Sequence, residues 1–239
     1  MTEFPADIFT EPADVDPDTL RNLGPLRRMA GIWEGTKGTD INPGPDGTRR
    51  QAYLERIEMQ PIDPQTNGPQ LFYGLHYTLR ATKPDEPETY HHQTGYWLWE
   101  PATGTVIQTL TIPRAQVAMA VGRATAGATR FELTATRGAP DYGICSTPFL
   151  EHAFRTESYR IAVKLNPDGT WSYEEDTVLA VLGRAEPFHH TDGNTLTKVA
   201  DPTPNPLARG RPGQRESAAH DPATEQPRRE NSRPPLSDP

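Results

Sequence analysis

Between residues 31 and 199 the chain alternates apolar and polar side chains with a period of two. The clearest example is residues 70–80, where Tyr73, Leu75 and Tyr77 fall on one face. Successive side chains of a strand point to opposite faces, so this pattern predicts strands. Together with β-branched and aromatic residues and intervening turn sequences, it predicts ten strands, at residues 31–40, 51–62, 70–80, 89–99, 105–112, 115–123, 129–137, 151–165, 170–183 and 194–199.

One segment before the strands has a helical pattern instead. Residues 17–30 place apolar residues at helical spacing on one face, namely Leu20, Leu23, Leu26 and Met29. Gly24 is followed by Pro25, which can divide the segment into two short turns.

The order of these elements predicts the fold class. No helix long enough to connect parallel strands lies between the predicted strands, so the sheet is expected to be antiparallel. We predict an all-β fold, a ten-stranded antiparallel up-and-down β-barrel with a short N-terminal helical plug, because closure removes exposed sheet edges. Ten strands enclose more space than eight, so we expect an interior cavity that holds a ligand. A two-sheet sandwich is the alternative architecture.

Composition restricts the folded part of the 239-residue chain to its middle. The hydrophobic share is 34%, the chain has 26 prolines, and the charged and Pro-rich segments lie at the ends. Such segments bury too little apolar surface to offset the entropy of ordering. We therefore expect an acidic flexible arm at 1–19, a barrel domain at 20–200 and a disordered Pro/Arg-rich tail at 201–239.

Charge and cysteine content exclude several classes of protein. A formal net charge of −8 argues against a nucleic-acid-binding surface, with an RNA-binding tail as the remaining alternative. Cys145 is the only cysteine, so no intrachain disulfide is possible, and we expect an inert, partly buried thiol in a loop. No apolar run resembles a signal peptide or a membrane span, so we expect a cytoplasmic protein without membrane contact.

Two histidine pairs are the candidate functional residues. His91 and His92 lie within one predicted strand and point to opposite faces, so at most one of them faces the cavity. His189 and His190 come just before the last predicted strand, where they form either a solvated turn or a ligand set at the barrel mouth. The sequence shows no zinc-site spacing, phosphate-binding loop or nucleophile elbow.

Trp33 stands between Gly31 and Gly35 at the start of the first predicted strand. It is expected either to fill the closed end of the barrel as core or to contact a ligand. The glycines on both sides would let another segment of backbone approach closely.

Four short segments occur in an order that is typical of one protein family. Residues 26–35 resemble a leucine-rich turn that runs into a Gly-x-Trp-x-Gly-x-Gly motif, whose third glycine, Gly38, comes one residue late. Residues 53–55, 91–97 and 190–199 resemble the second, fourth and closing strands of the same family. By these segments the chain resembles the nitrobindin family of haem-binding β-barrels, over about residues 23–200.

The resemblance implies a b-type haem, partly exposed at the barrel mouth, whose iron takes one histidine ligand. His190 is expected at this metal-ligating position, with His189 as the alternative; Trp33, His91 and His92 are the other candidate cofactor contacts. An apolar far side of the haem favours nitric oxide or reactive nitrogen species over dioxygen storage. Members of the family are described as isomerising peroxynitrite to nitrate, and no side chain is expected to act as a general acid or base.

Two other functions stay open at this point. The same cavity is suited to a carrier of fatty acid or another small apolar ligand, without any chemistry. Alternatively, the chain is an interaction module that acts through its tail at 201–239.

Overall fold

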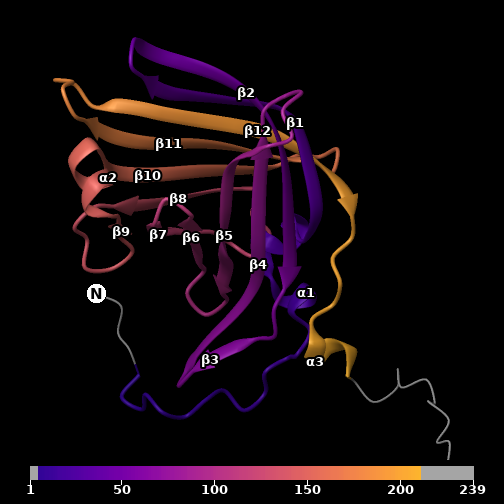
Figure 1. Cartoon of the computed structure of the whole chain (residues 1–239). Coiled ribbons are helices and arrows are strands. Elements are labelled where there is room, and N and C mark those ends of the chain that lie inside the picture. The colour runs from indigo at the N-terminus through magenta and orange to yellow at the C-terminus, as the bar shows by residue number, and fades with distance from the viewer. Residues whose placement is uncertain (1–4, 211–239) are drawn as a thin grey trace, which may run out of the picture.

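The computed structural model describes residues 5–210 of the chain. Its long strands are β1 (Gly31–Gly44), β2 (Gly47–Pro61), β4 (Gln70–Thr82), β5 (Thr89–Glu100), β6 (Thr105–Ile112), β7 (Gln116–Arg123), β8 (Arg130–Thr136), β10 (Phe154–Leu165), β11 (Trp171–Val181) and β12 (Phe188–Ala200). They pair in the order β2, β1, β12, β11, β10, β8, β7, β6, β5 and β4, and β2 also pairs with β4 (Figure 1). All these pairings are antiparallel. The predicted all-β, ten-stranded antiparallel barrel is confirmed.

Two short strands extend this ring. β3 (Gln65–Asn67) pairs with β4, and β9 (Ile144–Cys145) pairs with β7. Neither was predicted from the sequence, because two or three residues give no readable alternation. Cys145 is exposed and lies in β9, so the expectation of a partly buried thiol in a loop is wrong.

The predicted strand at 151–165 begins too early. Residues 148–153 form helix α2 (Pro148–Ala153), and β10 follows at Phe154. Thr147 is the N-cap, and its side chain accepts a hydrogen bond from the backbone N–H of Leu150. A capping threonine followed by proline at the first helical position stabilises a helix start, and this local signal prevails here.

The predicted strand at 194–199 begins too late. β12 starts at Phe188, so His189 and His190 lie inside a strand and not in a solvated turn. The segment Thr191-Asp192-Gly193-Asn194 has the composition of a turn. Backbone pairing with both β11 and β1 holds it extended, because tertiary context outweighs a weak local preference.

The N-terminal plug closes one end of the barrel. It consists of α1 (Thr19–Asn22) and the 3₁₀ helix η1 (Gly24–Met29), so the expected division of residues 17–30 occurs at Gly24. Gly24 has φ +53°, and a Cβ there would lie 2.5 Å from the Trp99 ring, so glycine is required. The plug buries Leu23, Leu26 and Met29 completely.

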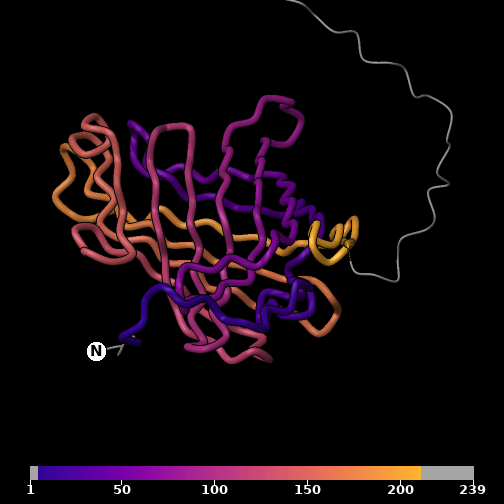
Figure 2. The backbone as a smooth tube through the Cα atoms, turned by 90° about the horizontal axis from the view of Figure 1, so that it is seen from below, coloured from indigo at the N-terminus to yellow at the C-terminus, as the bar shows by residue number. Residues whose placement is uncertain are grey.

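The chain that follows the barrel packs beside the plug. Asn205 is buried, its Nδ2 donates to the carbonyl of Pro17, and its Oδ1 accepts from the backbone N–H of Thr19. Helix α3 (Pro206–Arg209) comes next and lies near α1 (Figure 2). Ordered structure thus continues to residue 210, and the rest of the expected tail lies outside the described residues. Within residues 5–210, no helix is long and apolar enough to cross a membrane.

Candidate functional site

The end of the barrel away from the plug contains a cavity of about 430 Å³. One side is polar and comes mainly from β1, β5 and β12, with Asp40, Tyr90, His91, His190 and Asp192. Apolar side chains come mainly from the other elements, with Leu110, Ile112, Ala118, Ile144, Leu150, Phe154 and Leu179, and Gln116, Thr156 and Tyr159 lie on the same elements. β12 and β6 are five strands apart in the ring of ten, so His190 and Leu110 lie on opposite walls of the barrel.

The two neighbouring histidines of β12 point to opposite faces. His190 lines the cavity and is 32% exposed, and its Nε2 lies 2.8 Å from Oδ1 of Asp40. His189 lies on the outer surface, 62% exposed, with its Nδ1 2.9 Å from Asp176. Each histidine therefore pairs with an aspartate, but only the His190 pair belongs to the cavity.

Asp40 faces inward because of a bulge in β1. Gly35 pairs with Glu55 of β2 and Gly38 pairs with Tyr53, so three steps along β1 match two along β2. The bulge accommodates the one extra residue that precedes Gly38 relative to the family motif. Beyond it, the inward-facing positions of β1 change from odd-numbered to even-numbered residues. Side-chain space also requires glycine at 38, where a Cβ would lie 2.3 Å from the Tyr53 ring.

The cavity contains a row of acidic residues on three adjacent strands. Asp192 of β12 is directly opposite Asp40 of β1 on one side and Glu175 of β11 on the other. All three line the cavity. Asp40 also accepts hydrogen bonds on Oδ2 from Asn42 at 2.8 Å and from the Tyr90 hydroxyl at 3.1 Å. Like charges directly opposite one another destabilise a sheet, so this row favours protonation of one or more of its carboxyl groups.

The surroundings of these groups shift their pKa values in different directions. Burial raises the pKa of Asp40, but hydrogen bonds and the His190 charge outweigh it, and the pKa falls below its usual range. Burial lowers the pKa of His190, but its hydrogen bond to Asp40 and the charges of Asp40 and Asp192 raise it above its usual value. Burial and the charge of Glu175 raise the pKa of Asp192 well above its usual range. The shifts of Asp40 and His190 both favour an ion pair between the two side chains, and the shift of Asp192 favours its neutral form.

A further carboxyl group, that of Glu55, lies deeper in the barrel. Both Glu55 oxygens accept from the hydroxyl of Tyr173, which also contacts the hydroxyl of Tyr53 at 2.9 Å. Burial raises the pKa of Glu55 to about 8. Burial likewise raises the pKa of Glu175 to about 7, although Tyr159 donates a hydrogen bond to it at 2.7 Å.

The other predicted site residues lie in three different places. His91 lines the cavity, within 3.4 Å of Oε1 of Gln93, and burial lowers its pKa. His92 belongs to the opposite face of β5. Trp33 lies near the plug, where its indole N–H donates to the carbonyl of Met29 at 2.7 Å, and it does not line the cavity.

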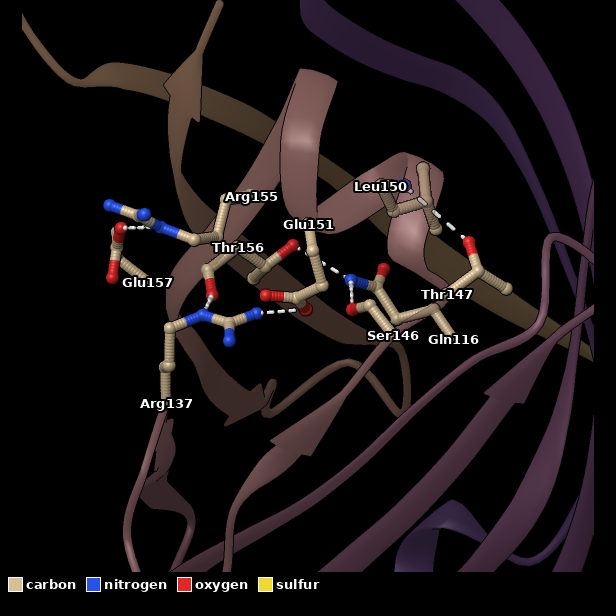
Figure 3. A network of polar contacts seen from close by, with 9 residues as sticks. All are labelled: Gln116, Arg137, Ser146, Thr147, Leu150, Glu151, Arg155, Thr156 and Glu157. Carbon is tan, nitrogen blue, oxygen red and sulfur yellow. Dashed lines mark hydrogen bonds and ion pairs between the residues drawn. The ribbon is translucent and has the colours of Figure 1, made fainter.

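A network of polar contacts holds α2 against the cavity mouth (Figure 3). Arg137, which directly follows β8, pairs with Glu151 of α2 and donates to the carbonyl of Thr156. Gln116 of β7 donates to both Ser146 and Thr156, each at 2.8 Å. These contacts fix the helix that supplies the cavity-lining side chain of Leu150.

Four charged residues line the cavity although no sequence pattern predicted them, namely Asp40, Arg114, Glu175 and Asp192. The alternation His190, Asp192, Asn194, Leu196 on one face of β12 was a readable signal, and a strand extended to residue 188 would have revealed it. Asp40 had no such signal, because its inward orientation depends on the β1 bulge.

The family's sequence profile for the THAP4-like, haem-binding β-barrel domain matches residues 22–198 of this chain. The chain belongs to this family. The expected relation to nitrobindin-type barrels is thereby confirmed. The THAP4-like barrel is also similar in fold to the crystal structure of Rv2717c from M. tuberculosis, with a TM-score of 0.52 and 22% identity, over 77% of this chain and 99% of that chain. No curated protein matches the chain in sequence.

The side chains that line the cavity of this THAP4-like barrel suit a haem in their chemistry. An imidazole faces an apolar wall across the barrel, and Arg114 offers a guanidinium that suits a propionate carboxylate. Binding of iron by His190 requires one rearrangement of these side chains. Nε2 of His190 contacts Asp40 at 2.8 Å, and a metal at the usual distance of about 2.0–2.1 Å from that nitrogen occupies the same space. His190 must therefore leave Asp40 before iron can take its place.

Proposed function

We propose that this protein binds haem b in the cavity at the open end of the barrel, with His190 as the axial ligand of the iron. The observation that carries the proposal is one cavity that joins an inward imidazole on β12 to apolar side chains on β6 and β7, in a member of a haem-binding family. His189 contacts Asp176 on the outer surface, so we assign it no part in the site.

Different residues would contact different parts of the haem. His190 holds the metal, Leu110 and Ile112 exclude water from the opposite side, and Arg114 pairs with a propionate. We propose that His91 contacts the haem or its ligand, because it lines the cavity and its lowered pKa keeps it neutral. Trp33 and His92 receive no such role.

We further propose nitric oxide or a reactive nitrogen species as the ligand, with isomerisation of peroxynitrite to nitrate as the candidate reaction. Bound haem supplies a Lewis-acidic iron for this chemistry. Leu110, Ile112 and Ala118 offer no side-chain hydrogen-bond donor, and the amide of Gln116 on β7 already donates to Ser146 and Thr156, which disfavours stable dioxygen binding. A cytoplasmic location is part of the proposal, since the single cysteine is a free thiol.

A haem titration tests the binding proposal. The Soret band of added haem should shift with one equivalent of wild-type protein. His190→Ala should weaken binding strongly, whereas His189→Ala, the matched change one residue away, should leave it unchanged. Equal binding by all three proteins would remove His190 from the site.

Stopped-flow decay of peroxynitrite tests the chemistry. Ferric wild-type protein should speed the decay and yield nitrate, and His190→Ala should not at equal haem loading. The alternative is a carrier of fatty acid or another small apolar ligand, which the apolar wall of the cavity also suits. Native mass spectrometry that finds lipid and no haem would favour the carrier.

A further inference from the structure

The polar wall of the cavity brings together side chains that can bind a metal ion without a porphyrin. Asp40 of β1 and His190 and Asp192 of β12 each offer one ligand atom, and these atoms lie within 4.8 Å of one another. Metal–ligand bonds of about 2.0–2.2 Å place neighbouring ligand atoms about 3 Å apart. The Asp40 oxygen and the His190 nitrogen, at 2.8 Å, are close to this separation. An ion that replaces the proton between them needs both side chains to turn toward it, whereas haem needs His190 to leave Asp40.

The strand register is the second observation. Asp40 and Asp192 are directly opposite each other on β1 and β12, and Glu175 of β11 continues the row. Opposed carboxylates destabilise a sheet unless a proton or a positive charge lies among them. A divalent cation supplies that charge, and His190, two residues from Asp192 on the same face of β12, adds a nitrogen ligand.

The Asp40 carboxylate is also held in position by other groups. Its Oδ2 accepts from Asn42 and Tyr90, which leaves Oδ1 directed at His190. Hydrogen bonds of this kind orient the ligands of metal sites. The outer pair of His189 and Asp176 belongs to no comparable three-residue group within residues 5–210.

The ligand types indicate the class of ion. Carboxylates suit hard ions such as Mn²⁺, and imidazole suits Zn²⁺ and Fe²⁺. We propose that Asp40, His190 and Asp192 bind one divalent first-row transition-metal ion, with its remaining coordination positions open to the cavity. This site goes beyond the proposed haem function and excludes it at any one moment, because both use Nε2 of His190.

Titration of the metal-free full-length protein with Mn²⁺, followed by electron paramagnetic resonance, tests the proposal, and calorimetry with Zn²⁺ repeats it. Wild-type protein should bind one equivalent. Asp192→Asn and Asp40→Asn should each weaken binding by more than about tenfold. Asp176→Asn, which changes the outer pair, should bind as wild type does. Thermal unfolding checks that each variant is folded.

If the wild-type protein binds neither Mn²⁺ nor Zn²⁺, the proposal is overturned. This outcome does not depend on whether the variants fold. Unchanged affinity in Asp192→Asn overturns it as well. The haem proposal is tested separately in the same set of proteins. Asp192→Asn should lose the metal and still bind haem, whereas His190→Ala should lose both. Metal binding without haem binding in the wild-type protein would refute the haem proposal alone.

Discussion

The closed and open ends of the barrel are built from the same strands but from different side chains. At the closed end, β1, β5 and β11 contribute Trp33, Trp99 and Trp171 to an apolar core around the plug. At the open end, β1 and β12 contribute Asp40 and His190 to a polar cavity. This difference indicates that the closed end supplies most of the free energy of folding. The open end retains charged groups that lower stability but can bind a ligand.

Trp33→Ala should show the largest effect on stability and so test this comparison most severely. The indole is almost fully buried, hydrogen-bonded to Met29, and packed edge-on against Trp171 at 6.2 Å. Removing such a side chain costs about 3–5 kcal/mol of unfolding free energy. Urea unfolding measures the loss, with His190→Ala as the open-end counterpart, which should cost far less. A similar loss in both variants would contradict the assignment of stability to the closed end.

Glu55→Gln should change how stability depends on pH. The folded-state pKa of Glu55 is about 8, above its unfolded value, so the folded protein binds the extra proton between these values. The contribution of Glu55 to the free energy of unfolding is therefore fully present below the unfolded pKa. It is lost as pH rises toward 8, by on the order of 1 kcal/mol per pH unit. The glutamine variant should have a flatter profile between pH 5 and pH 8.

Urea unfolding at several pH values measures this profile. Glu58→Gln is the matched control, because Glu58 lies on the same strand but is half-exposed and paired with Arg56 at 3.5 Å. Its profile should follow the wild type. If Glu55→Gln also kept the wild-type slope, the protonated, buried carboxyl group would be ruled out.

Arg137→Ala should have the smallest effect, confined to the cavity mouth. Arg137, in the turn after β8, pairs with Glu151 of α2 and donates to the carbonyl of Thr156, as Figure 3 shows. We expect a loss of about 1 kcal/mol or less in global stability, with faster amide hydrogen exchange in α2. Arg155→Ala, which removes an exposed pair with Glu157, should leave exchange in α2 unchanged. Slow exchange in both variants would show that α2 is held by other contacts.

The sequence predicted the closed end better than the open end, and the reason is physical. Apolar alternation in β4 and helical spacing in the plug identified Tyr77 and Leu26 as core, because burial of such residues leaves a periodic pattern. At the open end, a turn-like sequence forms part of β12, and a bulge reorients Asp40. Both depend on pairing between distant strands, which no local pattern records.

Resonance Raman spectroscopy of the ferrous haem complex tests the central claim most directly, namely that the open end binds its ligand through His190 and not through His189. The iron–histidine stretching band reports the axial ligand itself. The band should be present in wild-type protein and in His189→Ala, and absent in His190→Ala. A band that persists in His190→Ala, or a wild-type protein that forms no haem complex, would contradict the account.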